Sequence, residues 1–142
     1  MQVPQKVKNF IWRACRNAMP TKHALMKRTV IADSICERCR DEAKDPLHAL
    51  WSCTELDIVW ADQALWSFRN AMGFVDFKDL VSWIVLEGKQ LDIFAVTAWK
   101  IWSQRNQVRV QAPATTFHQI IAVSKTSLNE FHLKRQRIET QV

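Results

Sequence analysis

Apolar residues recur at helical spacing along most of the chain, and this pattern predicts an all-α fold. In residues 5–17 the apolar positions follow i, i+3 and i+4 spacing, with basic side chains on the opposite face. Comparable stripes predict further helices over about 22–29, 55–71, 77–87, 90–110 and 114–139. The run VSWIV within 77–87 also fits a buried strand, but its helical neighbours favour a helix.

Composition agrees with a helical globular protein. The chain has 142 residues, enough for one domain with a real core, and 48% of them are hydrophobic, which excludes general disorder. Only two glycines and four prolines interrupt it, and we expect Gly88 to end the helix that Asp76 caps and Pro113 to open the last helix. The seven tryptophans are expected mainly in the core.

No secretory or membrane-spanning segment is predicted. No apolar run follows Met1, and no stretch approaches the 18 or so apolar residues that a bilayer requires. We therefore expect an intracellular protein, nuclear or cytoplasmic, without a membrane partner. In such a compartment cysteines are expected as thiols rather than disulfides.

Four residues have the spacing of a zinc site. Cys36, Cys39, His48 and Cys53 form a C-x2-C-x8-H-x4-C pattern, in which the tight C-x2-C turn aims two sulfurs at one point. Three thiolates and one imidazole would complete a tetrahedral shell, so the predicted site is structural, with no open position for water. An accidental cluster and a disulfide are the alternatives, and Cys15 is interpreted as a small buried residue.

The second half of this spacing predicts a break in the helix. On a regular α-helix residues five apart lie about 140° from each other, so His48 and Cys53 could not both face one metal. Asp45, followed by proline, is expected to cap a helix that begins just before His48. Thr54 and Asp57 resemble a capping box that would restart the helix after Cys53.

Positive charge is concentrated at the N-terminal end. The net charge is +6, yet residues 1–40 hold nine Lys or Arg against two acids, a local charge of +7. A basic half beside a zinc site is typical of nucleic-acid contact, and a solvated basic face without a partner is the alternative. The predicted nucleic-acid-binding residues are Lys6, Lys8, Arg13, Arg16, Lys27, Arg28, Arg38 and Arg40. Trp12 shares the side of Arg16, where it could stack on a base, although core packing is favoured.

Residue patterns that support catalysis are missing from the sequence. The four histidines are scattered, two isolated glycines cannot build a phosphate-binding loop, and no acidic cluster offers a two-metal site. The chain is therefore expected not to be an enzyme, and zinc is expected to organise its fold.

With these residues in view, the chain resembles the zinc-binding domain that follows the reverse transcriptase in plant non-LTR retrotransposon polyproteins. The matching pattern runs through VPQKVKNFIWR and MPTKHALMKR to the four predicted ligands and Trp60. The segment AWKIWSQRN is similar, more weakly, to the helix that such polyproteins place before a ribonuclease H domain. One departure is Lys44, where these proteins usually have Glu; here the acid is Asp45, next to it.

The resemblance implies a reverse-transcriptase-type zinc-binding domain over 1–70 and a helical extension over 71–142, the region that would precede ribonuclease H. It implies a zinc-stabilised, non-catalytic module that binds the backbone of RNA or DNA, with a reverse transcriptase as a further partner. Two alternatives stay open. One is a scaffold that docks on a polymerase or another partner, marked by an exposed apolar patch over 83–102. The other is a decayed retroelement fragment without selected function.

Overall fold

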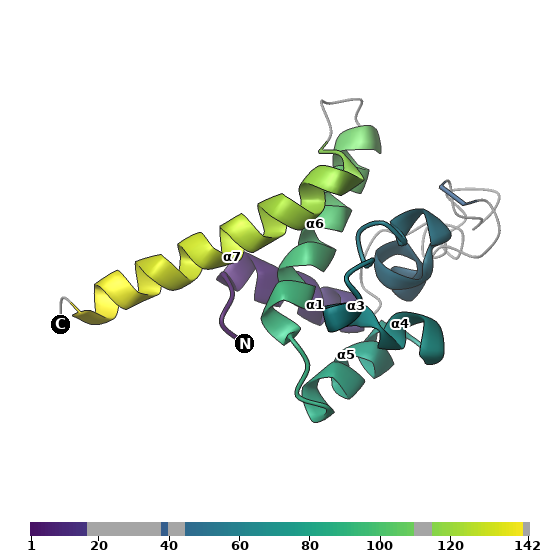
Figure 1. Ribbon diagram of the computed structural model, residues 1–142, viewed down its shortest axis with the longest axis horizontal. Helices are drawn as coiled ribbons and strands as arrows, with labels where there is room; N and C mark the ends of the chain where they lie inside the picture. Colours follow the sequence, from purple (N-terminus) through teal and green to yellow (C-terminus); the bar gives the residue numbers. More distant parts are fainter. Residues whose placement is uncertain (17–37, 40–44, 110–114, 141–142) are drawn as a thin grey trace. The chain divides into compact units, whose positions relative to one another are not determined.

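The computed structural model describes residues 1–16, 38–39, 45–109 and 115–140 (Figure 1). Every regular element in these ranges is helical, so the all-α prediction is confirmed. The predicted helix over 22–29 and the predicted role of Pro113 lie outside the described residues. Among the helices that are described, none combines the length and apolar character needed to cross a bilayer.

The chain divides into two compact units, and each is described by itself. One unit combines Met1–Ile11 with Gln90–Val142, and the other is Trp12–Lys89. The predicted boundary near residue 70 separates a zinc-binding domain from a helical extension by family resemblance. The two compact units do not test that boundary, so it stays a prediction.

Helix α1 (Gln5–Cys15) confirms the first predicted helix. Its apolar face is buried through Val7, Phe10, Ile11 and Ala14, as the spacing of these residues predicts. Its other face is exposed, and it includes Trp12, whose side chain is 60% exposed. The favoured prediction that Trp12 packs in the core is therefore wrong.

In the first unit, α6 (Leu91–Arg109) and α7 (Phe117–Thr140) pack against each other, and the C-terminal part of α7 extends away from α6 (Figure 1). The predicted stripe of α6 is confirmed, since Phe94, Ala98 and Ile101 are fully buried, and Ile120 of α7 is buried as well. Burial of these apolar side chains is the main stabilising term available to the unit.

A capping box sets the start of α7. The Gln119 N–H donates to Thr116 Oγ1 at 3.2 Å, and the Thr116 N–H donates to Gln119 Oε1 at 2.9 Å. Two N–H groups that the first turn leaves without helical partners are satisfied in this way. The helix therefore begins at Phe117, a little later than the predicted start at Ala114.

The N-terminal segment of the chain is tied to α6 and α7. The Gln2 N–H donates to Asp92 Oδ1 at 3.1 Å, and His132 Nε2 lies 3.0 Å from the Gln2 carbonyl oxygen. Because a carbonyl can only accept, Nε2 is the ring nitrogen that carries the proton in this contact. Val3, next in the chain, is buried. These contacts hold the beginning of the chain against both helices.

The second unit is built from short helical elements. They are a π-helix η1 (His48–Ser52), a 3-10 helix η2 (Thr54–Leu56), α3 (Gln63–Trp66), α4 (Phe68–Ala71) and α5 (Phe77–Leu86). The prediction of one helix over 55–71 is wrong. In a continuous α-helix Trp60 and Trp66 would point about 120° apart. The breaks instead let both rings enter one cluster, with their centroids 5.0 Å apart.

Helix α5 begins and ends as predicted. The Asp76 carboxylate accepts from the Asp79 N–H at 2.8 Å, so Asp76 is the N-cap. At the other end the N–H groups of Gly88 and Lys89 donate back into the last turn in a Schellman motif. This motif needs a left-handed residue, and Gly88 has φ 64.

Candidate metal centre

The turn that carries His48 begins at Asp45, which caps it. The Asp45 carboxylate accepts from the His48 N–H at 2.8 Å, and its carbonyl oxygen accepts from the Ala49 N–H at 2.8 Å. The predicted N-cap is thereby confirmed. Asp45 thus fixes the backbone of His48 and places the imidazole early in the turn.

A π-turn resolves the spacing between His48 and Cys53. The Cys53 N–H donates to the His48 carbonyl oxygen at 3.1 Å, an i→i+5 hydrogen bond that brings the two residues to the same side of the turn. Cys53 then leaves the helix with φ −57 and ψ 131. The predicted break at Cys53 is confirmed. The break follows a π-turn, which was not predicted from the sequence.

Three of the four predicted ligands converge. The donor atoms of Cys39, His48 and Cys53 all lie within 4.8 Å of one another, and Cys39 Sγ is 3.2 Å from His48 Nε2. A tetrahedral zinc with bonds of about 2.3 Å to sulfur and 2.0–2.1 Å to nitrogen needs ligand atoms roughly 3.5–3.8 Å apart. The cluster therefore fits a metal ion of this type after small side-chain adjustments.

The cluster is shielded from water. His48 is 4% exposed and Cys53 is fully buried, whereas Cys39 is half-buried. Soft thiolates with one imidazole are a donor set that favours zinc over hard cations such as magnesium. Cys36 lies outside the described residues, so the four-ligand set stays a prediction.

Side chains from distant parts of the unit satisfy the last carbonyl groups of η1. Such groups lack partners within a helix and are costly when buried without a donor. The donor–acceptor pairs are Arg38 Nη2 to Ala49 at 2.7 Å, Trp60 Nε1 to Leu50 at 3.1 Å and Arg69 Nε to Trp51 at 2.9 Å. Three consecutive carbonyl oxygens are thus held by three different side chains. The shape of the turn that aligns the ligands therefore depends on tertiary contacts.

Arg69 makes the most extensive of these contacts. Besides Trp51 it donates through Nη2 to the Cys53 carbonyl oxygen at 3.0 Å and pairs through Nη1 with the Asp57 carboxylate at 2.6 Å. Its side chain is only 7% exposed. Arg69 was not predicted as a functional residue from the sequence; the available signal was a lone cation on a predicted apolar helix. Asp57 faces this guanidinium, and Thr54 begins a 3-10 turn in which no side chain supplies a cap, so the predicted capping box is wrong.

An aromatic cluster surrounds the turn. The Trp51 ring stacks on Phe68 with centroids 5.4 Å apart and contacts Trp60 at 4.9 Å, while Trp66 meets it edge-on at 6.2 Å. These rings bury large apolar areas beside the ligands and keep solvent away from them. The predicted structural role of the tryptophans is confirmed for this cluster.

Cys15 is absent from the metal cluster. Burial raises the pKa of its thiol, the nearby Asp76 raises it further, and Lys78 partly opposes the shift. A thiol that stays protonated is a weak metal ligand and a weak nucleophile. Cys15 is half-buried, so it is less buried than predicted.

The predicted nucleic-acid-binding residues fall into three groups. Lys6, Arg13 and Arg16 are exposed, and Lys8 is half-buried. Arg38 is half-buried and donates to the Ala49 carbonyl, so in this structure it supports the turn between His48 and Cys53. The remaining predicted residues, Lys27, Arg28 and Arg40, lie outside the described part of the chain.

The class of protein that fold and site define is an all-helical domain with a Cys–His–Cys cluster of metal-binding geometry. Residues 1–60 match the family described as zinc-binding in reverse transcriptase, which confirms the family resemblance. That match includes the cluster, and it covers a zinc-binding domain rather than a polymerase or ribonuclease H domain.

A curated relative points to the same origin. An Arabidopsis thaliana protein, named as a candidate ribonuclease H protein, is 27% identical over 114 residues. The aligned region is 74% of this chain but only 18% of the relative, so the chain spans less than a fifth of that protein. The similarity is consistent with descent from a retrotransposon. No solved structure matches the chain.

Proposed function

We propose that this chain is a zinc-stabilised, non-catalytic nucleic-acid-binding module derived from a retrotransposon reverse transcriptase. Zinc would be held by Cys36, Cys39, His48 and Cys53, and the convergence of three of these residues supports the assignment. In small domains of this kind zinc binding contributes about 10–16 kcal/mol at neutral pH, most of it as folding free energy. Zinc is therefore proposed as a fold organiser.

The observation that carries the nucleic-acid proposal is the exposed face of α1. Arg13 and Arg16 are exposed there, no ion pair joins them to an acid among the described residues, and they lie in the segment that matches the family. The Arg16 guanidinium lies 4.3 Å from the centroid of the Trp12 ring. An exposed indole flanked by cations suits stacking on a nucleobase while the cations contact phosphates. Backbone contacts of this kind are largely independent of base sequence.

Fluorescence anisotropy with labelled single-stranded RNA and DNA of the same sequence tests this function. We expect affinity to fall steeply as KCl rises from about 50 to 200 mM, because bound phosphates release counterions. The Arg13→Ala, Arg16→Ala double variant should reduce the slope of log Kd against log salt by about 1.4, roughly 0.7 for each phosphate that is no longer neutralised. Absence of binding at low salt, or a slope unchanged by this variant, would overturn the proposal.

A second candidate is a scaffold that docks on a protein partner. An exposed apolar patch over 83–102 would favour this function. Part of such a patch is present, because Val85 is 55% exposed and Leu86 is 83% exposed at the end of α5. From Leu91 to Trp102, however, the side chains are buried or half-buried. Within 83–102 the exposed large apolar side chains are therefore confined to the end of α5. Nucleic-acid binding is the better supported of the two.

A further inference from the structure

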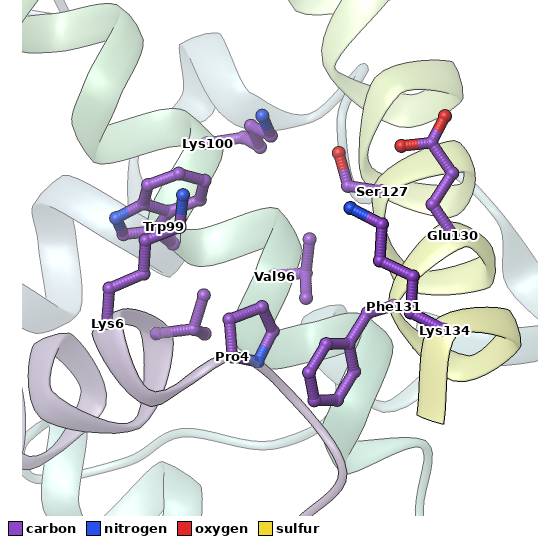
Figure 2. A pocket seen from close by; sticks show the side chains of 10 residues that line it. Pro4, Lys6, Val96, Trp99, Lys100, Ser127, Glu130, Phe131 and Lys134 are labelled. Carbon is purple, nitrogen blue, oxygen red and sulfur yellow. The ribbon is translucent and has the colours of Figure 1, made fainter. Parts of the chain in front are cut away.

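Helices α1, α6 and α7 enclose a pocket in the unit formed by Met1–Ile11 and Gln90–Val142 (Figure 2). Its volume is about 230 Å³. A phosphate group fits a space of this size.

The lining of this pocket is strongly positive. One lysine comes from each helix, namely Lys6 from α1, Lys100 from α6 and Lys134 from α7 (Figure 2). Glu130 is the single acid among the lining residues, so the lining has a net charge of +2. In the described part of the chain no ion pair joins this glutamate to any of the three lysines.

Two of these ammonium groups share one aromatic ring. Lys6 Nζ lies 4.7 Å and Lys100 Nζ 4.8 Å from the Trp99 ring centroid, within the range of cation–π attraction. Burial lowers the pKa of Lys100, and the charge of Lys6 lowers it further. The ring thus holds together two cations that repel each other. A bound anion would relieve that repulsion.

The other lining groups complement a phosphate ester. Ser127 places a hydroxyl donor in the pocket, while Pro4 and Phe131 provide an apolar wall (Figure 2). The hydroxyl and the ammonium groups can each donate a hydrogen bond to a phosphate oxygen. Lysine contacts phosphate as a point charge without reading a base.

We propose that this pocket binds one phosphate group of a nucleic-acid backbone. The inference deepens the proposed nucleic-acid-binding function and rests on it. It assigns a role to α6 and α7, which lie beyond the segment that matches the zinc-binding family. Lys100 and Lys134 become phosphate-contacting residues. Trp99 positions Lys6 and Lys100, which lie over its ring.

The first arm of the test is anisotropy with the labelled single-stranded RNA at several KCl concentrations. The Lys100→Ala, Lys134→Ala double variant should reduce the slope of log Kd against log salt by about 0.7, because the pocket no longer neutralises its one phosphate, and each single variant should reduce the slope by less. Lys134→Arg should retain the slope. The matched control is Lys125→Ala, which removes an exposed lysine of α7 outside the pocket lining and should leave the slope unchanged. Circular dichroism checks that every variant is folded.

The second arm uses inorganic pyrophosphate and does not depend on nucleic acid. The Trp99 indole N–H resonance, assigned with Trp99→Phe, should shift on titration in the wild type and stay in place in the Lys100→Ala, Lys134→Ala double variant. If RNA binds but the pocket variants behave like Lys125→Ala, the pocket assignment is overturned while the proposed function stands. If pyrophosphate shifts the resonance but no nucleic acid binds, the nucleic-acid assignment is overturned and the pocket is a site for free phosphates. No shift with pyrophosphate would overturn the pocket as a phosphate site.

Discussion

Replacing Arg69 by alanine would remove the side chain that holds the end of the turn between His48 and Cys53. Arg69 donates to the carbonyl oxygens of Trp51 and Cys53 at 2.9 and 3.0 Å. A hydrogen bond to a charged group contributes about 1.5–3 kcal/mol, and unpaired buried carbonyls add a desolvation penalty. The ion pair with Asp57 contributes about 0–1 kcal/mol, since the Asp57 side chain is 66% exposed. We therefore expect Arg69→Ala to lower the free energy of unfolding by about 3 kcal/mol.

The same change should weaken metal binding. Cys53 is a member of the ligand cluster, and its carbonyl oxygen is fixed by Arg69. Loss of groups that orient metal ligands usually weakens metal affinity 10–100-fold. Zinc affinity is measured by competition with a chromophoric chelator. Stability is measured by urea unfolding, followed by circular dichroism, at saturating zinc.

Two control variants separate the carbonyl contacts from the ion pair. Asp57→Asn removes the ion pair but leaves both carbonyl bonds, so it should cost less than about 1 kcal/mol. Arg69→Lys retains the charge without the planar set of donors, and we expect an intermediate loss. Unchanged zinc affinity and stability in Arg69→Ala would refute the reasoning. So would an Asp57→Asn variant as damaged as Arg69→Ala.

Three further predictions concern separate parts of the chain. Cys53→Ser should abolish stoichiometric zinc binding and reduce the helicity measured by circular dichroism. Cys15→Ser, which lies outside the cluster, should keep both zinc and helicity. Equal behaviour of the two variants would contradict the assignment of Cys53 as a ligand. Trp12→Ala should weaken single-stranded RNA binding by about 1–3 kcal/mol while Trp12→Phe retains most of it, and an unchanged Kd in anisotropy would exclude stacking. Thr116→Ala should cost about 1 kcal/mol in urea unfolding, because it removes the capping box of α7, and a fully stable variant would show that the cap contributes nothing.

Local patterns were sufficient to predict much of the fold. The helices at α1, α5, α6 and α7 follow from apolar spacing, and the cap at Asp76 and the turn at Gly88 follow from residue chemistry. The helix expected over 55–71 fails because periodicity does not show that two tryptophans converge on one cluster. Trp12 was misplaced for a related reason, since aromatic residues at helical spacing are usually buried and this one is not.

The candidate site was likewise predictable only in part. The spacing of Cys39, His48 and Cys53, together with the angular mismatch of residues five apart, predicted both the cluster and the break at Cys53. The π-turn could not be predicted, because it depends on donors far away in the sequence. Arg69, for example, lies 16 residues from the Cys53 carbonyl that it holds. Only the folded chain brings these groups together.

The central claim is that zinc organises this fold, and the zinc-to-chain ratio of the purified wild-type protein tests it most directly. After dialysis against metal-free buffer, we expect inductively coupled plasma mass spectrometry to find one zinc per chain. Chelation should then remove the zinc together with much of the helical circular dichroism, since binding and folding are coupled in such sites. A protein that retains no zinc, and whose helicity is unaffected by a chelator, would contradict the account.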